Sequence, residues 1–240
     1  MWKFLFEFCD RLFAIVPVKK WRVFLREKVL FDYRRKLNAL RRARPTLNFA
    51  KMRLSKGGGS IVFIIGNDTF KVRKFSYESK EFTRFDHEKR ITDAIRPFCT
   101  IKIPNITFFD SDGFTFYETP KIAGKMLVDL PSQKIKKYQK QISKQLAQFI
   151  YEKSFANPPE IADLRGKIQK GFSWNHGDMC SNIMIDPKTM VITGIIDWEW
   201  AGYSDIENEF FGLVRVRKKM QKIGLDKSTR NEYQKIARKK

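Results

Sequence analysis

The most informative part of the chain reads WNHGDMCSNIMID over residues 174–186 and GIIDWE over residues 194–199. The first stretch holds Asp178 and Asn182 on one loop, and the second places Asp197 at the end of an apolar run. A carboxylate can orient and deprotonate an acceptor hydroxyl, while an amide oxygen and a second carboxylate hold Mg²⁺ against phosphate oxygens. This order of residues therefore predicts phosphoryl transfer from a nucleotide.

The two stretches resemble the catalytic and metal-binding motifs of the aminoglycoside phosphotransferase and choline kinase superfamily, which has a protein-kinase-like fold. The resemblance implies that Asp178 is the catalytic base and that Asn182 and Asp197 bind Mg²⁺. It also implies that His176 supports the catalytic loop. The chain departs from the family pattern in this loop, because three residues separate Asp178 from Asn182 where the family usually has four. Downstream, Glu209 stands where the family more often has Asp. An ordinary turn would explain a lone His-Gly-Asp, but not the second motif that follows it.

A glycine-rich segment upstream is the predicted phosphate-binding loop. Its residues are Gly57, Gly58, Gly59 and Ser60. Glycines let the main chain approach phosphate oxygens closely, so that backbone N–H groups can bind them. A linker is the alternative interpretation of such a triplet.

A lysine and a glutamate complete the predicted phosphate site. By resemblance to the kinase fold, Lys71 would neutralise the phosphates and Glu88 on the following helix would hold it in an ion pair. A surface lysine on a strand is the alternative, and Arg73 or Lys74 could be confused with Lys71. Further along, Tyr117 and Glu118 resemble the hinge of the same superfamily, where main-chain groups meet adenine.

The hydrophobic pattern predicts an α+β chain with a two-lobed protein-kinase-like fold. A small antiparallel sheet lobe would contain strands over residues 60–65, 69–75, 106–110 and 114–118 and a helix over residues 81–95. A mainly helical lobe would contain a long helix over residues 132–155 and a β region over residues 183–198. The predicted limits are residues 1–48 for an N-terminal segment, 49–118 for the nucleotide-binding lobe and 119–240 for the catalytic lobe with its basic tail.

Residues 1–48 are predicted to form a basic amphipathic helical segment, which Pro17 divides. Trp and Phe side chains recur among Lys and Arg between Trp2 and Phe31. Such a segment can lie in the headgroup region of an anionic bilayer, where apolar burial and charge attraction add. Helices packed on the following domain would show the same pattern, so both interpretations stay open.

The chain has 48 Lys and Arg residues against 26 Asp and Glu residues, which gives a formal net charge of +22. This excess predicts a polyanionic neighbour, and an anionic membrane surface is favoured. Nucleic acid is disfavoured because the basic residues form no recognisable reading motif. Three separated cysteines and the lack of a spanning apolar run predict a cytoplasmic protein, peripheral on the cytoplasmic face of the membrane.

Together these features predict a phosphotransferase that uses ATP and Mg²⁺ and acts on a hydroxyl of a small molecule or a membrane-linked sugar. A precursor of envelope lipopolysaccharide or polysaccharide is one such acceptor. A soluble alcohol, such as choline or an aminoglycoside, is the nearer alternative, and a protein serine or threonine is the next. A prediction of another class is a pseudokinase or basic membrane-binding module whose shortened loop no longer transfers phosphate.

Overall fold

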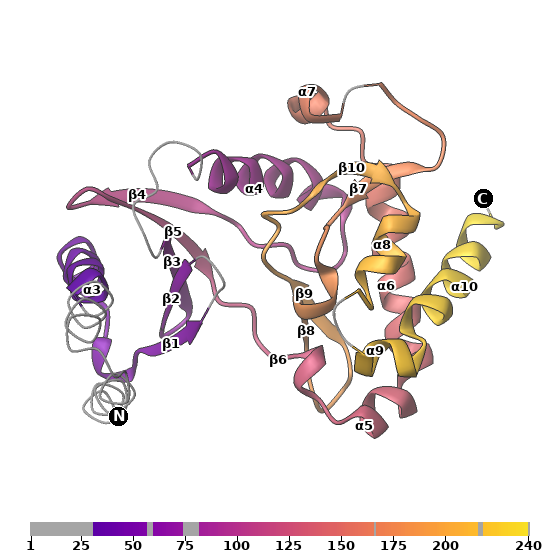
Figure 1. Ribbon diagram of the computed structural model, residues 1–240, viewed down its shortest axis with the longest axis horizontal. Helices are drawn as coiled ribbons and strands as arrows, with labels where there is room; N and C mark the ends of the chain where they lie inside the picture. The colour runs from indigo at the N-terminus through magenta and orange to yellow at the C-terminus, as the bar shows by residue number, and fades with distance from the viewer. Residues whose placement is uncertain (1–30, 57–59, 74–81, 166, 216–217, 240) are drawn as a thin grey trace, which may run out of the picture. The chain divides into compact units, whose positions relative to one another are not determined.

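A computed structural model describes residues 31–56, 60–73, 82–165, 167–215 and 218–239. The fold is α+β, and the described chain forms two compact units (Figure 1). The first contains the described residues up to Arg73 together with residues 107–119. The second contains residues 82–106 and the described chain from Pro120 onward. The domain limits predicted from the sequence stay predictions.

The described part of the first unit is a five-stranded sheet with one α-helix. The strand order is β1-β2-β3-β5-β4, and β1 with β2, β2 with β3, and β4 with β5 pair antiparallel. The elements are α3 (Phe31–Ala43), η2 (Phe49–Lys51), β1 (Arg53–Lys56), β2 (Ser60–Ile65), β3 (Asp68–Arg73), β4 (Thr107–Ser111) and β5 (Phe114–Pro120).

Two hairpins form this sheet where the sequence predicts them. The β2–β3 turn contains Gly66, whose φ of 61° suits a residue without a side chain. In the β4–β5 turn both Asp112 and Gly113 have positive φ, 51° and 75°. This is the two-residue hairpin turn whose twist matches that of the strands it joins. Within the predicted strand over 69–75, residues 74 and 75 lie outside the described part of the chain.

Helix α3 packs on this sheet. Its residues Leu37, Ala39 and Leu40 are buried in one apolar cluster with Phe63 of β2 and Phe116 of β5. This helix is therefore part of the core of the first unit, as the packing interpretation of the N-terminal segment expects. The rest of that segment, residues 1–30, lies outside the described residues.

The second unit contains two small sheets and most of the helices. One sheet pairs β7 with β10, and the other has the order β6-β8-β9. The elements are α4 (Phe82–Ile95), η3 (Arg96–Phe98), β6 (Lys125–Met126), η4 (Leu127–Asp129), α5 (Ser132–Lys137), α6 (Gln139–Ser154), η5 (Pro159–Ile161), α7 (Ala162–Arg165), β7 (Phe172–Asn175), η6 (Met179–Ser181), β8 (Ile183–Ile185), β9 (Ile192–Ile195), β10 (Gly202–Asp205), α8 (Glu207–Gly212), α9 (Lys218–Ile223) and α10 (Leu225–Ala237).

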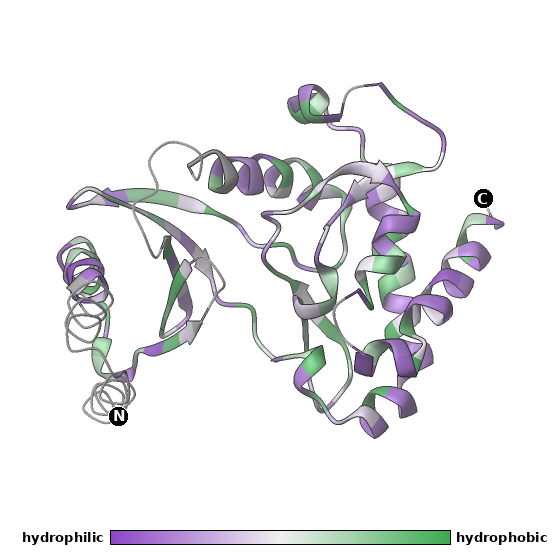
Figure 2. Cartoon of the chain, viewed as in Figure 1, coloured by the Kyte–Doolittle hydropathy of each residue, from purple (hydrophilic) through white to green (hydrophobic). Residues whose placement is uncertain are grey.

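The predicted helix over residues 132–155 is divided at Tyr138. Its backbone, with φ of −105° and ψ of 14°, leaves the helical region and separates α5 from α6. Helix α6 then buries Ile142, Leu146 and Phe149 in the core of the second unit, whereas α10 is largely hydrophilic (Figure 2). Within the described residues, no helix has the length and apolar character needed to cross a bilayer.

Candidate active site

The predicted catalytic loop runs from the end of β7 to the start of β8. Gly177 has a φ of 82°, and a Cβ on it would lie 2.3 Å from the carbonyl oxygen of Trp200. Any side chain at this position would collide with backbone, so the tight passage from His176 to Asp178 requires glycine. Asp178 itself is half-buried at the start of η6.

The imidazole of His176 joins the catalytic loop to the metal-binding segment. Its Nδ1 accepts from the backbone N–H of Asp178 at 3.2 Å, so its proton is on Nε2, which donates to the carbonyl oxygen of Ile196 at 2.9 Å. Burial lowers the pKa of His176 and keeps the ring neutral, which preserves the acceptor at Nδ1. His176 thus links Asp178 to the residue that precedes Asp197, in keeping with the supporting role that the resemblance implies.

Asn182 closes the shortened loop. Its side-chain Nδ2 donates to the carbonyl oxygen of Asp178 at 2.7 Å, and its own carbonyl oxygen accepts from the N–H of Ile196 at 3.0 Å. Because the amide nitrogen is used within the loop, the amide oxygen is the atom that could meet a metal. The loop therefore keeps Asp178 and Asn182 together despite having one residue fewer than the family usually has.

Asp197 has a strained backbone that is held on both sides. Its φ of 66° is left-handed, which is uncommon for a residue other than glycine and recurs at functional sites. The next residue, Trp198, donates its N–H to the Glu88 carboxylate at 2.9 Å and its indole N–H to the carbonyl oxygen of Ile195 at 2.9 Å. The buried indole also lies 4.7 Å from the His176 ring, centroid to centroid. Glu88 of α4 thus helps to fix the segment that carries Asp197.

A buried ion pair supports the loop from the interior of the second unit. Its lysine is not among the site residues predicted from the sequence. Glu209 of α8 accepts from the backbone N–H of His176 at 2.8 Å. Its other carboxylate oxygen lies 2.6 Å from Nζ of Lys153 of α6, and the two side chains are 1% and 0% exposed. Lys153 also donates to the carbonyl oxygen of Trp174 on β7. The pair therefore reaches the catalytic loop from two helices.

The signal for Lys153 was present in the sequence. It continues the apolar stripe of Ile142, Leu146 and Phe149 at helical spacing, so a cation there must be buried and paired. Glu209 stands where the family more often has Asp. No local pattern connects the two residues, which are far apart in the chain.

The predicted nucleotide-binding residues of the first unit lie on its sheet, apart from Gly57, Gly58 and Gly59, which fall outside the described residues. Ser60 begins β2 and is buried. Nζ of Lys71 lies 4.8 Å from the ring centroid of the buried Tyr117, so β3 and β5 bring these two together. Glu118 forms an ion pair with Arg44 at 2.6 Å. Because Lys71 and Glu88 belong to different units, their ion pair stays a prediction.

The described residues contain no group of three or more His, Cys, Asp or Glu side chains arranged to hold a metal ion. Mg²⁺ in nucleotide sites needs only one or two carboxylates, because waters and phosphates supply the other ligands. Asp197 and Asn182 both offer oxygen, and the hydrogen bond from Ile196 to Asn182 holds their segments next to each other. The pair therefore fits Mg²⁺ bound together with a nucleotide, and the metal ligands stay a prediction.

Comparison with protein families finds a match over the part of the chain that contains these residues. The model of the family described as the phosphotransferase enzyme family matches residues 105–233, which is more than half of the chain. This range contains the whole catalytic loop and Asp197. Among curated protein sequences, no match to the chain is found.

Several solved structures share the fold. The GDP and kanamycin complex of APH(2")-IIia matches with a TM-score of 0.64 and 14% identity, over 83% of this chain and 82% of that chain. The streptomycin-ATP-APH(2")-IIa ternary complex matches with a TM-score of 0.60 and 14% identity, over 82% and 81%. Aminoglycoside phosphotransferase APH(3'')-Id from Streptomyces rimosus ATCC10970 matches with a TM-score of 0.59 and 14% identity, over 84% and 92%. These matches confirm the predicted fold class.

Replacing either member of the buried pair should destabilise the protein and disturb the catalytic loop. Lys153→Met leaves the Glu209 carboxylate buried without its cation, which should cost about 3–5 kcal/mol of unfolding free energy. The double variant Lys153→Met with Glu209→Gln should lose less than the sum of the single losses, by about 0.5–3 kcal/mol. Denaturant unfolding measures both quantities. Additive losses would contradict direct coupling between the two side chains.

Proposed function

The chain belongs to the phosphotransferase enzyme family and is a kinase that acts on hydroxyl groups, and from this premise we propose its donor, its metal and its class of acceptor. It transfers the γ-phosphoryl group of ATP, bound with Mg²⁺, to a hydroxyl of a saccharide, with a membrane-linked sugar as the favoured case. The observation that carries this proposal is the path from Asp178 through His176 to Ile196, beside Asp197. These hydrogen bonds would keep the distance and orientation between the base Asp178 and the metal ligand Asp197 constant during turnover.

The proposed roles follow from the chemistry of each side chain. Asp178 orients the acceptor hydroxyl and receives its proton, while Asn182 and Asp197 hold Mg²⁺. When bound, Mg²⁺ neutralises charge on the transferring phosphate. In the first unit, Lys71 would pair with the phosphates, and the backbone near Tyr117 would meet adenine. The glycine-rich loop and its Ser60 would contribute backbone N–H groups, and Glu88 would hold Lys71.

The class of acceptor is suggested by a hollow of about 400 Å³ that Gly177 of the catalytic loop lines. Trp200 and Phe211, which also line it, expose 55% and 56% of their surface. Aromatic faces suit sugar rings, and Asn208 can bind hydroxyls. Among the described residues that line it, none is acidic and Arg215 is the one charged residue. A polycationic aminoglycoside would need carboxylates for its amines, so the hollow suits a neutral or anionic sugar better.

Two other functions have a specific observation behind them. The neighbouring structures in complex with kanamycin and with streptomycin favour a soluble aminoglycoside as the alternative acceptor. The shortened loop between Asp178 and Asn182 favours a pseudokinase or basic binding module. A protein serine or threonine is a weaker alternative, because the glycine after His176 resembles small-molecule kinases.

Substitution of the two aspartates should separate binding from turnover. Asp178→Asn should keep Mg²⁺-dependent nucleotide binding and reduce turnover by about 10²–10⁴-fold, because it removes a positioned base. Asp197→Ala should lose the Mg²⁺-dependent part of nucleotide affinity. Thermal shift with ATP, with and without Mg²⁺, measures binding, and ADP release measures turnover. Asp129→Asn, at an exposed position, is the matched control. Equal Mg²⁺-dependent affinity in wild type and Asp197→Ala would disprove the metal assignment.

A panel of acceptors should distinguish the sugar classes. We expect neutral or anionic saccharides to stimulate ADP release and kanamycin to leave it unchanged. Arg215→Glu should then weaken the response to anionic saccharides more than the response to neutral ones, because it reverses the charge in the hollow. Stimulation by kanamycin that Trp200→Ala abolishes would instead support the aminoglycoside alternative.

The peripheral membrane role is proposed for residues 1–30, which contain seven Lys and Arg residues against three carboxylates, together with several aromatic side chains. Deleting these residues should weaken sedimentation with phosphatidylglycerol vesicles at least tenfold, since each cation near an anionic leaflet contributes about 1 kcal/mol. Nucleotide binding should remain, because α3 stays in place. Deletion through residue 45 removes α3 from the core and should unfold the first unit. Undiminished vesicle binding without residues 1–30 would refute this role.

A further inference from the structure

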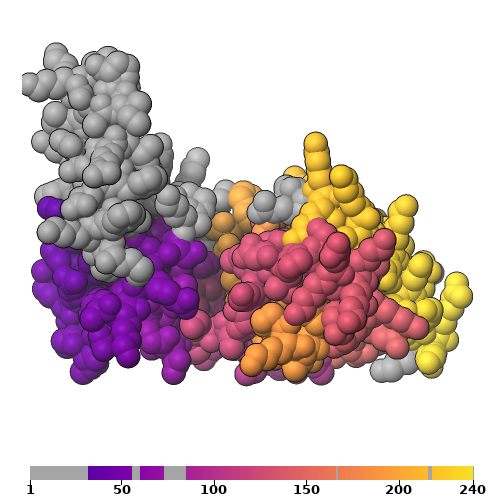
Figure 3. Space-filling model, turned by 90° about the horizontal axis from the view of Figure 1, so that it is seen from below, coloured from indigo at the N-terminus to yellow at the C-terminus, as the bar shows by residue number. Residues whose placement is uncertain are grey.

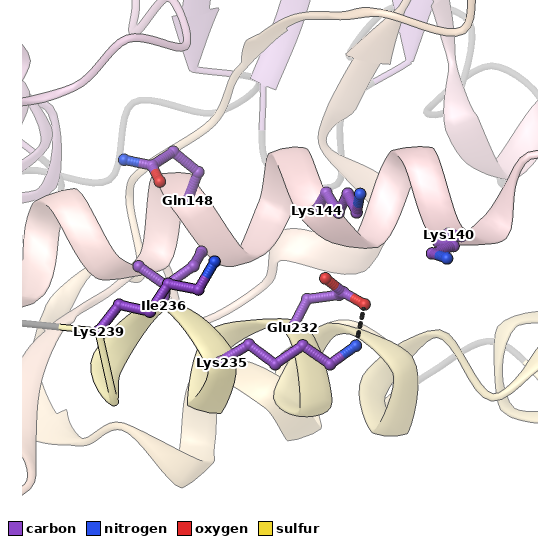
Figure 4. Close-up of a pocket in the computed structure, with 7 residues that line it drawn as sticks. All are labelled: Lys140, Lys144, Gln148, Glu232, Lys235, Ile236 and Lys239. Carbon is purple, nitrogen blue, oxygen red and sulfur yellow. Dashed lines mark hydrogen bonds and ion pairs between the residues drawn. The ribbon is translucent and has the colours of Figure 1, made fainter.

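Helices α6 and α10 of the second unit lie side by side and form a lysine-lined groove of about 410 Å³. Figure 4 shows Lys140 and Lys144 on α6 beside Lys235 on α10 and Lys239, which follows the end of α10. All four residues are exposed. In the space-filling view of Figure 3, the rose atoms of α6 adjoin the yellow atoms of the C-terminal helices. These four residues are called the lysine groove below.

The lysine groove continues into a second hollow, of about 710 Å³, along α5 and α6. The two hollows share Lys140 and Lys144, and the second adds Lys137 and Tyr138. Residues four positions apart lie on one face of a helix, which explains why Lys140 and Lys144 point to the same side. Lys235 lies on α10, and Lys239 lines the same hollow just beyond the end of that helix. The result is an extended basic surface and not one enclosed site.

One carboxylate lies among the four lysines. Glu232 pairs with Lys235 at 2.7 Å, and its side chain is 13% exposed. The hydrogen bond from Lys235, together with the charges of Lys144 and Lys140, holds the pKa of Glu232 below its usual range. A single carboxylate cannot neutralise four ammonium groups, so the groove keeps an excess of positive charge.

The packing of the two helices does not depend on these lysines. The rings of Tyr151 on α6 and Tyr233 on α10 lie 6.1 Å apart, and Leu225 and Thr229 of α10 are buried. Gathering like charges at the surface opposes folding. The lysine groove is therefore better explained by an anionic partner than by the stability of the helix pair.

We propose that the lysine groove docks the second unit onto the phosphate headgroups of an anionic bilayer. The surface is long and open, so it can contact the flat surface of a bilayer. Its cations are lysines, whose flexible side chains can reach towards the headgroups. Nucleic-acid surfaces favour arginine forks and several stacking aromatics. Among the described residues that line the two hollows there is no arginine, and Tyr138 is the single aromatic residue. This docking is separate from residues 1–30 and does not depend on the phosphotransferase chemistry.

The test compares two variants of the full-length chain that each lose four positive charges. The groove variant is Lys140→Gln, Lys144→Gln, Lys235→Gln and Lys239→Gln. The control variant is Lys102→Gln, Lys167→Gln, Lys170→Gln and Lys188→Gln, all at exposed positions outside the groove. Each lysine near an anionic leaflet contributes about fivefold to the binding constant. Sedimentation with phosphatidylglycerol vesicles should therefore weaken at least tenfold for the groove variant and no more than about threefold for the control. Thermal unfolding checks that both variants fold.

A variant that is expected to bind vesicles more strongly adds a test that misfolding cannot imitate, because a misfolded protein would not gain this binding. Glu232→Gln should strengthen vesicle binding severalfold, because it removes the one carboxylate of the groove. Equal losses in the groove and control variants would show that only net charge matters and would overturn the proposal. Unchanged binding by the groove variant would also overturn it. So would a groove variant that loses binding to duplex DNA while it retains vesicles, since the occupant would then be nucleic acid.

Discussion

The candidate catalytic centre depends on the hydrogen bond between the backbone N–H of His176 and the Glu209 carboxylate, 2.8 Å long and fully buried. A buried carboxylate is costly to desolvate, and Lys153 compensates that cost at 2.6 Å. From this anchor the His176 ring reaches both Asp178 and the segment before Asp197. The positions of Asp178 and Asp197, the proposed base and the proposed metal ligand, therefore depend on a buried charge balance deep in the second unit.

The parts of the fold that could be predicted are those encoded in adjacent residues. Asp112 and Gly113 form a turn because both tolerate positive φ, and the run of β-branched and aromatic residues in β2 indicates a strand. The tight passage at Gly177 is encoded in the same way, because a Cβ at this position would collide with the backbone of Trp200. In each case a local steric requirement selects the residue type, so one short stretch of sequence carries the information.

What could not be predicted depends on partners far away in the chain. The pairing of β7 with β10 joins short segments that lie almost thirty residues apart, and neither is long enough to show a clear period by itself. The division of the long helix at Tyr138 interrupts a periodicity that continues on both sides of it. The partner of Lys153 is visible only once α6 and α8 are placed together, because the apolar stripe of α6 indicates that Lys153 is buried but not which carboxylate it meets.

The shortened catalytic loop need not weaken the site, because its ends are held independently of its length. The side-chain amide of Asn182 donates to the carbonyl oxygen of Asp178, so it joins the two ends of the loop. The carbonyl oxygen of Asn182 accepts from the N–H of Ile196, which attaches the loop to the segment before Asp197. At the start of the loop, Glu209 holds His176 where the family more often has the shorter Asp. A glutamate reaches one methylene further from α8 and still has a second oxygen for Lys153. The longer carboxylate and its buried lysine thus supply a rigid support for a loop that has lost one residue, and the loss does not separate Asp178 from Asn182.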